Sequence, residues 1–429
     1  MRLPMRHLVA PAALVAAIAL AAGPGARPPR LATAANCEGT ATGLVPLTDL
    51  GAGQYEGHPG GLYPDGANTP PAAHLAAAVA RAAAIAPLDT AGAPAAGGRV
   101  VVLSLGMSNA TQEFSRFVQL ANADPQKHGR VLLVDGAQGG QTASVIRDPS
   151  ANFWAVVDQR LARAGSSAAQ VQVIWLKEAN AQPGGRFPPD SFPAAAKALQ
   201  DDLVAVVQVA QARFPNARLL YLASRTYGGY ASTALNPEPY AYESGFSVKW
   251  LIEQQVGGDP ALNPDPARGV VRAPLLLWGP YLWGDGLTPR ADGLVWRCED
   301  FVANDGTHPS PSGRHKVASL LLGFFKSDPT ARGWFMADPA ATPAAVPTFD
   351  PGGQPTVAPP TATAARSTAT ASRQATPTAT ASTEATPTPA VTVCVDCARG
   401  GPAYLPWLGR DAAAGATSSQ PSMGRVHGK

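Results

Sequence analysis

A carboxylate stands three residues before a histidine in the segment Asp305-Gly-Thr-His308, ahead of a proline and a Ser/Gly-rich turn. Such an Asp can accept a hydrogen bond from one ring nitrogen, which leaves the other nitrogen free to take a proton from a nucleophile. The alternative is a capped helix start, because Ser310 and Ser312 precede the helix-like run 315–325. The pair is catalytic only if the rest of the chain supplies a nucleophile.

Polar or glycine residues follow three apolar runs that are typical of buried strands. Ser108 lies in GMSN, where a helix N-terminus would favour developing negative charge, unless the serine only caps that helix. Gly139 and Gly140 in the next such segment expose backbone N–H groups to a ligand or form an ordinary turn. Asn180 after the third run can donate to an oxyanion or bond the loop backbone. Together with the Asp–His pair, this order favours a serine hydrolase site.

Five continuous apolar runs can position these residues. They cover 99–106, 130–137, 171–179, 217–225 and 273–282. Continuous apolarity is typical of parallel strands buried on both faces, and helix-period segments lie between the runs. The pattern predicts a three-layer α/β/α sandwich with a parallel five-stranded sheet. Ligands bind beyond the carboxyl ends of such strands, which is where the polar residues stand.

Composition narrows the class of protein. Only 15% of the 429 residues are charged and the formal net charge is +3, which argues against nucleic acid as a partner. Residues 1–22 combine a basic start with an apolar stretch of about 15 residues and a small-x-small site, as in a secretory signal peptide. An uncleaved anchor helix is the alternative. We expect no transmembrane segment in the mature chain and a secreted or cell-surface location.

The chain divides by composition into a globular part and a tail. Residues 36–338 form the expected catalytic domain, and 339–390 form a Thr/Pro/Ala/Ser-rich segment that we expect to be disordered. Residues 391–429 are a short tail with an apolar patch, which suggests cell-surface association.

Four cysteines are present, and export makes disulfides permissible. Cys37 and Cys298 stand near the two ends of the expected domain, so one bridge would tie down the N-terminal arm. Cys394 and Cys397 are expected to form a small local disulfide, because no further ligands complete a zinc site. We expect no metal and no cofactor.

These motifs resemble the blocks of the SGNH/GDSL-type hydrolases over roughly residues 98–326, and GMSN is similar to the G-Q-S-N of the carbohydrate-esterase branch. The resemblance implies a flavodoxin-like fold and a Ser108–His308–Asp305 triad. It also implies an oxyanion hole formed by the Ser108 N–H, the Gly140 N–H and the Asn180 amide. Met107 and Lys177 depart from the family pattern without replacing a catalytic group.

Substrate contacts are expected from residues within these blocks and from the loops after the fourth and fifth strands. We assign to substrate binding Asn109, Glu178, Arg225, Tyr227, Tyr281 and Trp283. Aromatic rings with polar neighbours suit sugar rings, whereas the alternative is that these rings pack loop against sheet.

The sequence therefore predicts a secreted serine esterase that hydrolyses acyl esters, with acetyl esters of a small molecule or polysaccharide as the expected substrates, through an acyl-enzyme on Ser108. An acyltransferase with the same residues is one alternative. A non-catalytic cell-surface binding protein is another, because a fold alone does not establish a function.

Overall fold

A parallel five-stranded sheet is the centre of the computed structural model, which describes residues 34–340, 348–349 and 354–356. Its strands are β3 (Val100–Gly106), β4 (Val131–Asp135), β5 (Val171–Lys177), β6 (Leu219–Ala223) and β7 (Leu275–Trp278). They pair in the order β4-β3-β5-β6-β7, and every neighbouring pair is parallel. Each of the five predicted runs contains one of these strands, so the sheet prediction is confirmed. The runs are continuously apolar because helices cover both faces.

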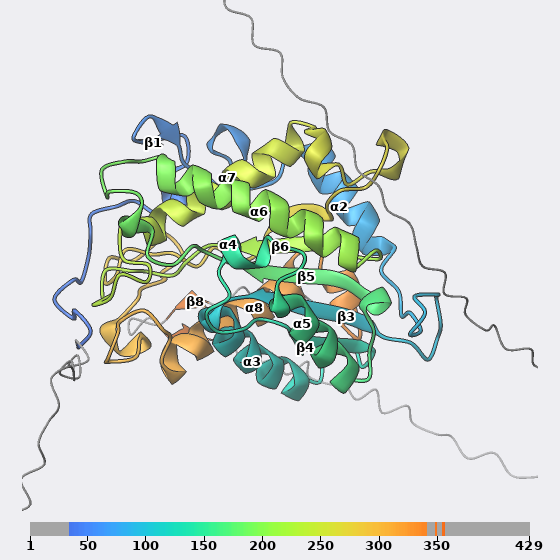
Figure 1. Ribbon diagram of the computed structural model, residues 1–429. Helices are drawn as coiled ribbons and strands as arrows, with labels where there is room; N and C mark the ends of the chain where they lie inside the picture. Colours follow the sequence, from blue (N-terminus) through green and yellow to red (C-terminus); the bar gives the residue numbers. More distant parts are fainter. Residues whose placement is uncertain (1–33, 341–347, 350–353, 357–429) are drawn as a thin grey trace, which may run out of the picture. The chain divides into compact units, whose positions relative to one another are not determined.

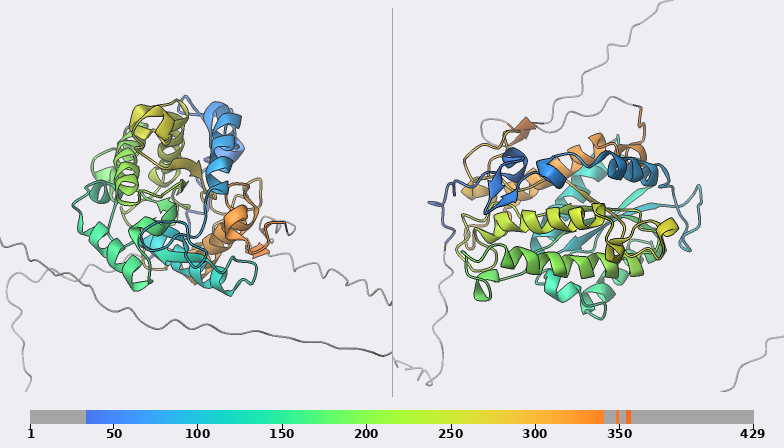
Figure 2. Two further views of the ribbon diagram at one scale, coloured as in Figure 1. Left: turned by 90° about the vertical axis from the view of Figure 1, so that its right-hand side faces the viewer. Right: turned by 90° about the horizontal axis from the view of Figure 1, so that it is seen from above.

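Helices form a layer on each side of this sheet (Figures 1 and 2). On one side lie α3 (Ser108–Ala123), α8 (Pro311–Ser327) and α2 (Ala72–Ala83), and on the other lie α5 (Asn152–Arg163), α6 (Ala194–Arg213) and α7 (Tyr240–Val256). Renumbered along the sheet, the strand order is 2-1-3-4-5, which is the flavodoxin-like order. The predicted three-layer α/β/α sandwich is therefore confirmed.

Short elements connect and extend these layers. They are α1 (Leu47–Leu50), β1 (Gln54–Tyr55), β2 (His58–Pro59), α4 (Ala143–Ile146), α9 (Arg332–Phe335), β8 (Thr348–Phe349) and β9 (Pro355–Thr356), with 3₁₀ turns at Pro64–Gly66, Ala168–Gln170, Pro183–Gly185, Pro260–Leu262, Pro266–Arg268 and Cys298–Asp300.

The N-terminal arm, residues 34–68, is attached to loops that follow the last two strands. Cys37 and Cys298 form a disulfide with their Cα atoms 5.4 Å apart. Asp285 accepts hydrogen bonds from the backbone N–H groups of Thr42 and Gly43, at 2.6 and 2.9 Å. The arm therefore covers part of the segment after β7, where we expected substrate contacts.

Several predictions concern residues outside the described ranges. They are the signal peptide at 1–22, nearly all of the segment 339–390, and the tail 391–429 with Cys394 and Cys397. Among the helices that the structure does describe, none combines the length and the apolar character needed to cross a bilayer.

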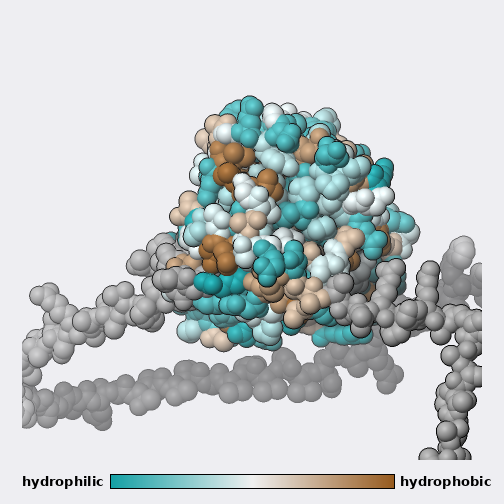
Figure 3. Space-filling model, turned by 90° about the vertical axis from the view of Figure 1, so that its left-hand side faces the viewer, coloured by the Kyte–Doolittle hydropathy of each residue, from teal (hydrophilic) through white to brown (hydrophobic). Residues whose placement is uncertain are grey.

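Large exposed apolar side chains are scattered over the described surface. Among the described residues these side chains are those of Val45, Val79, Val145, Val270 and Leu287; Val270 is 69% exposed and the others are 40–45% exposed. Figure 3 shows small, separate hydrophobic groups among hydrophilic residues on one face. That face presents no broad apolar patch of the kind that marks a lipid-binding surface.

Candidate active site

Three residues from two distant parts of the chain meet beyond the carboxyl end of β3. Ser108 is the first residue of α3, directly after β3, and its Oγ lies 2.8 Å from His308 Nε2. The other ring nitrogen, Nδ1, lies 2.6 Å from Asp305 Oδ2. An ionised carboxylate only accepts hydrogen bonds, so Nδ1 carries the proton and Nε2 is free to accept from the serine hydroxyl. Ser–His–Asp hydrogen bonds of this order activate a serine.

The loop that holds Asp305 and His308 is fixed by its own backbone. Asp305 Oδ1 accepts the N–H groups of Thr307 and His308, at 2.8 and 2.9 Å. Burial alone would raise the pKa of Asp305, but these bonds and the imidazole hold it below its ordinary value. Gly306 has φ 60°, and a Cβ there would lie 1.8 Å from the Tyr230 carbonyl oxygen. The loop therefore requires glycine at 306.

Asn109 holds this loop against the start of α3. It is 3% exposed, and its Nδ2 donates to the Thr307 carbonyl oxygen at 2.9 Å. We predicted a substrate contact for Asn109, but the structure uses its amide to join the helix of Ser108 to the loop of His308. Asn109 is therefore corrected to a residue that joins these two segments, whereas Ser108 beside it is partly exposed.

The other interpretation of the segment around His308, a capped helix start, is also found in the structure. The Ser310 Oγ accepts from the Gly313 N–H at the beginning of α8, at 3.4 Å. Ser312 Oγ instead donates to Asp300 at 2.6 Å. The segment therefore both begins a helix and holds a histidine beside Ser108, and the two interpretations are compatible.

Two glycines after β4 face the start of α3 differently. A Cβ built on Gly139 would lie 3.9 Å from Ser108 Cβ, whereas one on Gly140 would meet nothing within 4 Å. Gly140 has φ 75°, which favours glycine at that position. The turn therefore passes close to Ser108 at Gly139.

Asn180 lies just beyond β5, whose last residue, Lys177, pairs with Gly106 at the end of β3. Its Oδ1 accepts the Ser144 N–H at 3.0 Å, and its Nδ2 donates to Asp202 Oδ2 at 2.7 Å. These contacts match the alternative in which the amide bonds a loop backbone. They leave one of the two N–H donors on Nδ2 for a ligand. Asp202, which sequence reasoning missed, orients this amide from α6.

A group of buried charges lies at the ends of β5 and β6. Lys177 donates to both carboxylate oxygens of Glu113 at 2.6 Å, and both side chains are almost fully buried. Glu178 and Arg225, which we assigned to substrate binding, are only 1% and 4% exposed. Burial raises the pKa of Glu178 and lowers that of Arg225. These positions correct the assignment, because side chains so enclosed lie beneath the surface.

The predicted aromatic substrate contacts are buried as well. Tyr227 donates from its hydroxyl to the Gly39 carbonyl oxygen at 2.6 Å, and Trp283 Nε1 donates to Glu238 at 2.8 Å. The Tyr281 hydroxyl accepts from the backbone N–H of Leu47. All three rings are 4% exposed or less, so they pack loops and arm against the sheet, as the alternative stated. This corrects the prediction that sugar rings stack on them.

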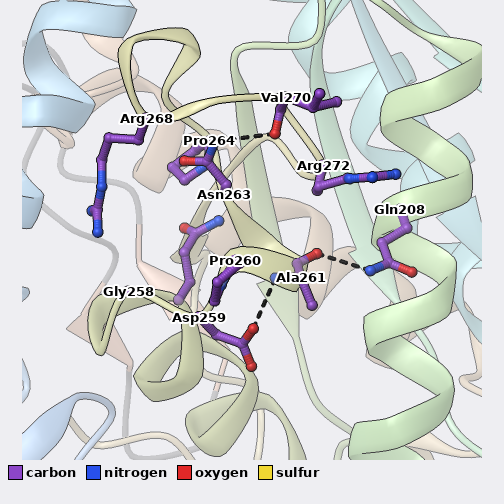
Figure 4. Close-up of a pocket in the computed structure, with 11 residues that line it drawn as sticks. Gln208, Gly258, Asp259, Pro260, Ala261, Asn263, Pro264, Arg268, Val270 and Arg272 are labelled. Carbon is purple, nitrogen blue, oxygen red and sulfur yellow. Dashed lines mark hydrogen bonds between the residues drawn. The ribbon is translucent and has the colours of Figure 1, made fainter.

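A cavity that includes none of the triad residues is lined by the side chains shown in Figure 4. It encloses about 580 Å³ between α6 and the loop 258–272, which precedes β7 and so lies at the amino ends of the strands. Some of its polar groups bond one another: Gln208 Nε2 donates to the Ala261 carbonyl oxygen and the Ala261 N–H to Asp259, both at 2.8 Å. Ligands of open α/β sheets bind at the other edge.

Within the described ranges, no group of three or more His, Cys, Asp or Glu side chains is arranged to hold a metal ion. Ser108 and His308 are placed for proton transfer to one another.

The strand order and layers define a flavodoxin-like α/β sandwich with a Ser–His–Asp arrangement at its strand ends. No family model matches the chain, and no curated protein matches it. Nine chains of solved structures do match. One is BT4096, a gut microbial diltiazem-metabolizing enzyme, with 14% identity, a TM-score of 0.31, and coverage of 54% of this chain and 48% of that one.

Two further matches have similar scores. The periplasmic domain of a lipopolysaccharide acetyltransferase of Salmonella ser. Paratyphi A has 13% identity, a TM-score of 0.28, and coverage of 51% of this chain and 80% of that one. The salicylyl-acyltransferase SsfX3 from a tetracycline biosynthetic pathway has 13% identity, a TM-score of 0.27, and coverage of 53% and 54%. The chain thus spans about half the length of BT4096 and of SsfX3. Similarity at these identities and TM-scores carries no argument about activity. The activity is therefore argued from the side chains of the site.

Proposed function

We propose that this chain is an exported serine esterase of the SGNH/GDSL type that hydrolyses acyl esters, with acetyl esters of carbohydrates as its substrates. The observation that carries the proposal is the chain of contacts from Ser108 Oγ to His308 Nε2, at 2.8 Å, and from His308 Nδ1 to Asp305 Oδ2, at 2.6 Å. A serine that only capped a helix would need neither partner. The motif resemblance supports the same assignment.

In the first half of the reaction, His308 Nε2 takes the hydroxyl proton as Ser108 Oγ bonds to the acyl carbon, and the carbonyl electron pair moves onto its oxygen. The N–H groups of Ser108 and Gly140 and the free N–H of Asn180 are the proposed donors to that oxyanion. The carbon–oxygen bond to the alcohol then breaks, and His308 returns the proton to the leaving alcohol. Water repeats the cycle on the acyl-enzyme and releases the acid and Ser108.

A fluorophosphonate tests the proposal without any choice of substrate. An activated Ser108 Oγ displaces fluoride and forms a stable bond to phosphorus, so the intact mass of the purified chain should rise by one adduct. The Ser108→Ala chain should stay unlabelled, whereas Ser150→Ala, which removes an exposed serine elsewhere, should label like the wild type. A folded wild-type chain with no adduct, or a Ser108→Ala chain that still labels, would contradict the proposal.

Substituting Asn180 tests the oxyanion assignment. Asn180→Ala should lower kcat for ester hydrolysis by about 100- to 1,000-fold, because the transition-state charge loses a donor. Since Asn180 also bonds Ser144 and Asp202, the thermal midpoint should be measured alongside kcat.

Asn216→Ala is the matched control, because it removes a similar amide bond, to the Ala169 carbonyl oxygen, at the other end of the sheet. Its kcat should equal that of the wild type. If Asn180→Ala kept full turnover, the third donor would have to be another group.

A further inference from the structure

A polar groove begins about one helical turn from the proposed triad. It encloses about 600 Å³ and is lined by residues of α3 and by Pro311 and Arg314 of α8. Thr111 in its lining is three residues after Ser108, and Pro311 is three residues after His308. Three residues of α-helix advance about 4.5 Å along the axis, so this end of the groove lies within reach of a substrate bound at Ser108.

Two guanidinium groups line the groove and are held without an acidic partner. Arg116 donates to Gln119 Oε1 at 2.9 Å and has its other terminal nitrogen 3.4 Å from His315 Nδ1. Arg314 donates through Nε to the Pro309 carbonyl oxygen at 2.9 Å. The ion pairs formed within the described part of the chain include neither arginine. These neutral partners orient the two guanidinium groups but do not neutralise their positive charge. Further N–H donors remain on both groups.

The acidic group beside the groove determines its net charge. Asp135 is the acidic group on its β4 side, and its carboxylate already accepts the hydroxyls of Thr111 and Ser115, at 2.5 and 2.9 Å. Two cations against one already bonded carboxylate give the groove a positive excess.

We propose that this groove selects ester substrates whose alcohol part is an acidic saccharide. A carboxylate on a sugar unit beyond the acylated one would pair with Arg116 and Arg314. Arg–carboxylate pairs can be bidentate, which provides orientation as well as affinity. Arg116 is eight residues after Ser108, about 12 Å along the helix axis, which places the charge beyond the scissile ester. The part of this inference that concerns ester hydrolysis rests on the proposed esterase function.

The test compares two probes that differ at their carboxyl groups: acetylated trigalacturonic acid, whose carboxylates are charged, and the same trisaccharide with its carboxyl groups neutralised as methyl esters. The release of acetate gives kcat/KM for each. The wild type should prefer the acid by about 10- to 100-fold, and added salt should reduce that preference. In the Arg116→Gln/Arg314→Gln chain the ratio should fall close to one. Arg163→Gln, an exposed arginine at the end of α5, should keep the wild-type ratio.

Binding to the Ser108→Ala chain, measured by calorimetry, separates this inference from the esterase assignment. The acidic probe should bind at least about tenfold more tightly than its methyl ester, and the two arginines should be required for the difference. Equal binding of both probes, or a preference that survives the double substitution, overturns the groove assignment. If charge-selective binding occurs while the wild type hydrolyses neither probe and takes no fluorophosphonate, the groove assignment stands and the esterase proposal fails.

Discussion

Replacing His308 with Gln should lower kcat for ester hydrolysis by about a millionfold, the scale measured when a comparable triad loses its histidine. Glutamine has an oxygen and an amide near the position of the ring but cannot take the Ser108 proton at neutral pH. Asp305→Asn should cost less, about 10⁴-fold, because the imidazole remains but loses the acceptor that fixes its tautomer. Initial rates of acetate release over several enzyme concentrations measure both effects.

His128→Gln is the matched control for these substitutions. His128 lies just before β4, at the amino end of the sheet, where its Nδ1 accepts from the Arg130 N–H. Its removal should leave kcat unchanged. The thermal midpoints of the triad variants should also stay near that of the wild type, since His308 is partly exposed. Equal rates for His308→Gln and His128→Gln would contradict the assignment of the general base.

Replacing Lys177 with Met should reduce the free energy of unfolding by about 3–5 kcal/mol, because it leaves the Glu113 carboxylate buried without its partner. Burial lowers the pKa of Lys177 to about 8 against the opposing effect of Glu113, so the lysine is still charged at pH 7. Glu113 has no exposed side-chain surface and cannot turn to water. Denaturant unfolding at pH 7 measures the change.

The double variant Lys177→Met/Glu113→Leu decides whether the loss comes from the orphaned charge. Buried ion pairs are often replaced by apolar groups at little cost, so the double variant should recover most of the stability lost in the single one. A double variant that is destabilised by the sum of the two single effects would mean that packing, rather than charge, accounts for the loss. Both outcomes are read from the same unfolding curves.

The sheet was readable from the sequence because its signal is local. Each of the five strands lies in a run of consecutive apolar residues, and burial on both faces requires that pattern. The residues that the structure brings together at Ser108 were also readable, because strand ends and the Asp305–His308 spacing are local features. Helix α3 begins at Ser108 itself, so the serine is the first helical residue and not a cap that precedes the helix.

Contacts between segments far apart in the sequence could not be predicted, because no local pattern indicates them. Tyr227, Tyr281 and Trp283 have residue types that suit a sugar site, but they are buried by one another and by the N-terminal arm, such as Gly39 and Leu47. The role of Asn109 depends on Thr307, 198 residues later. The groove also went unseen, since its two arginines lie on helices that only the fold brings together.

The bridge between Cys37 and Cys298 joins residues 261 positions apart. All five strands and α2 to α7 lie between them, and Asp305 follows the second cysteine by only seven residues. A protease that cut any single peptide bond in that interval would produce two pieces still held by one covalent link. The segment with His308 would then separate from the N-terminal piece only after a reductant had opened the bridge, so cleavage and release of the site are distinct events.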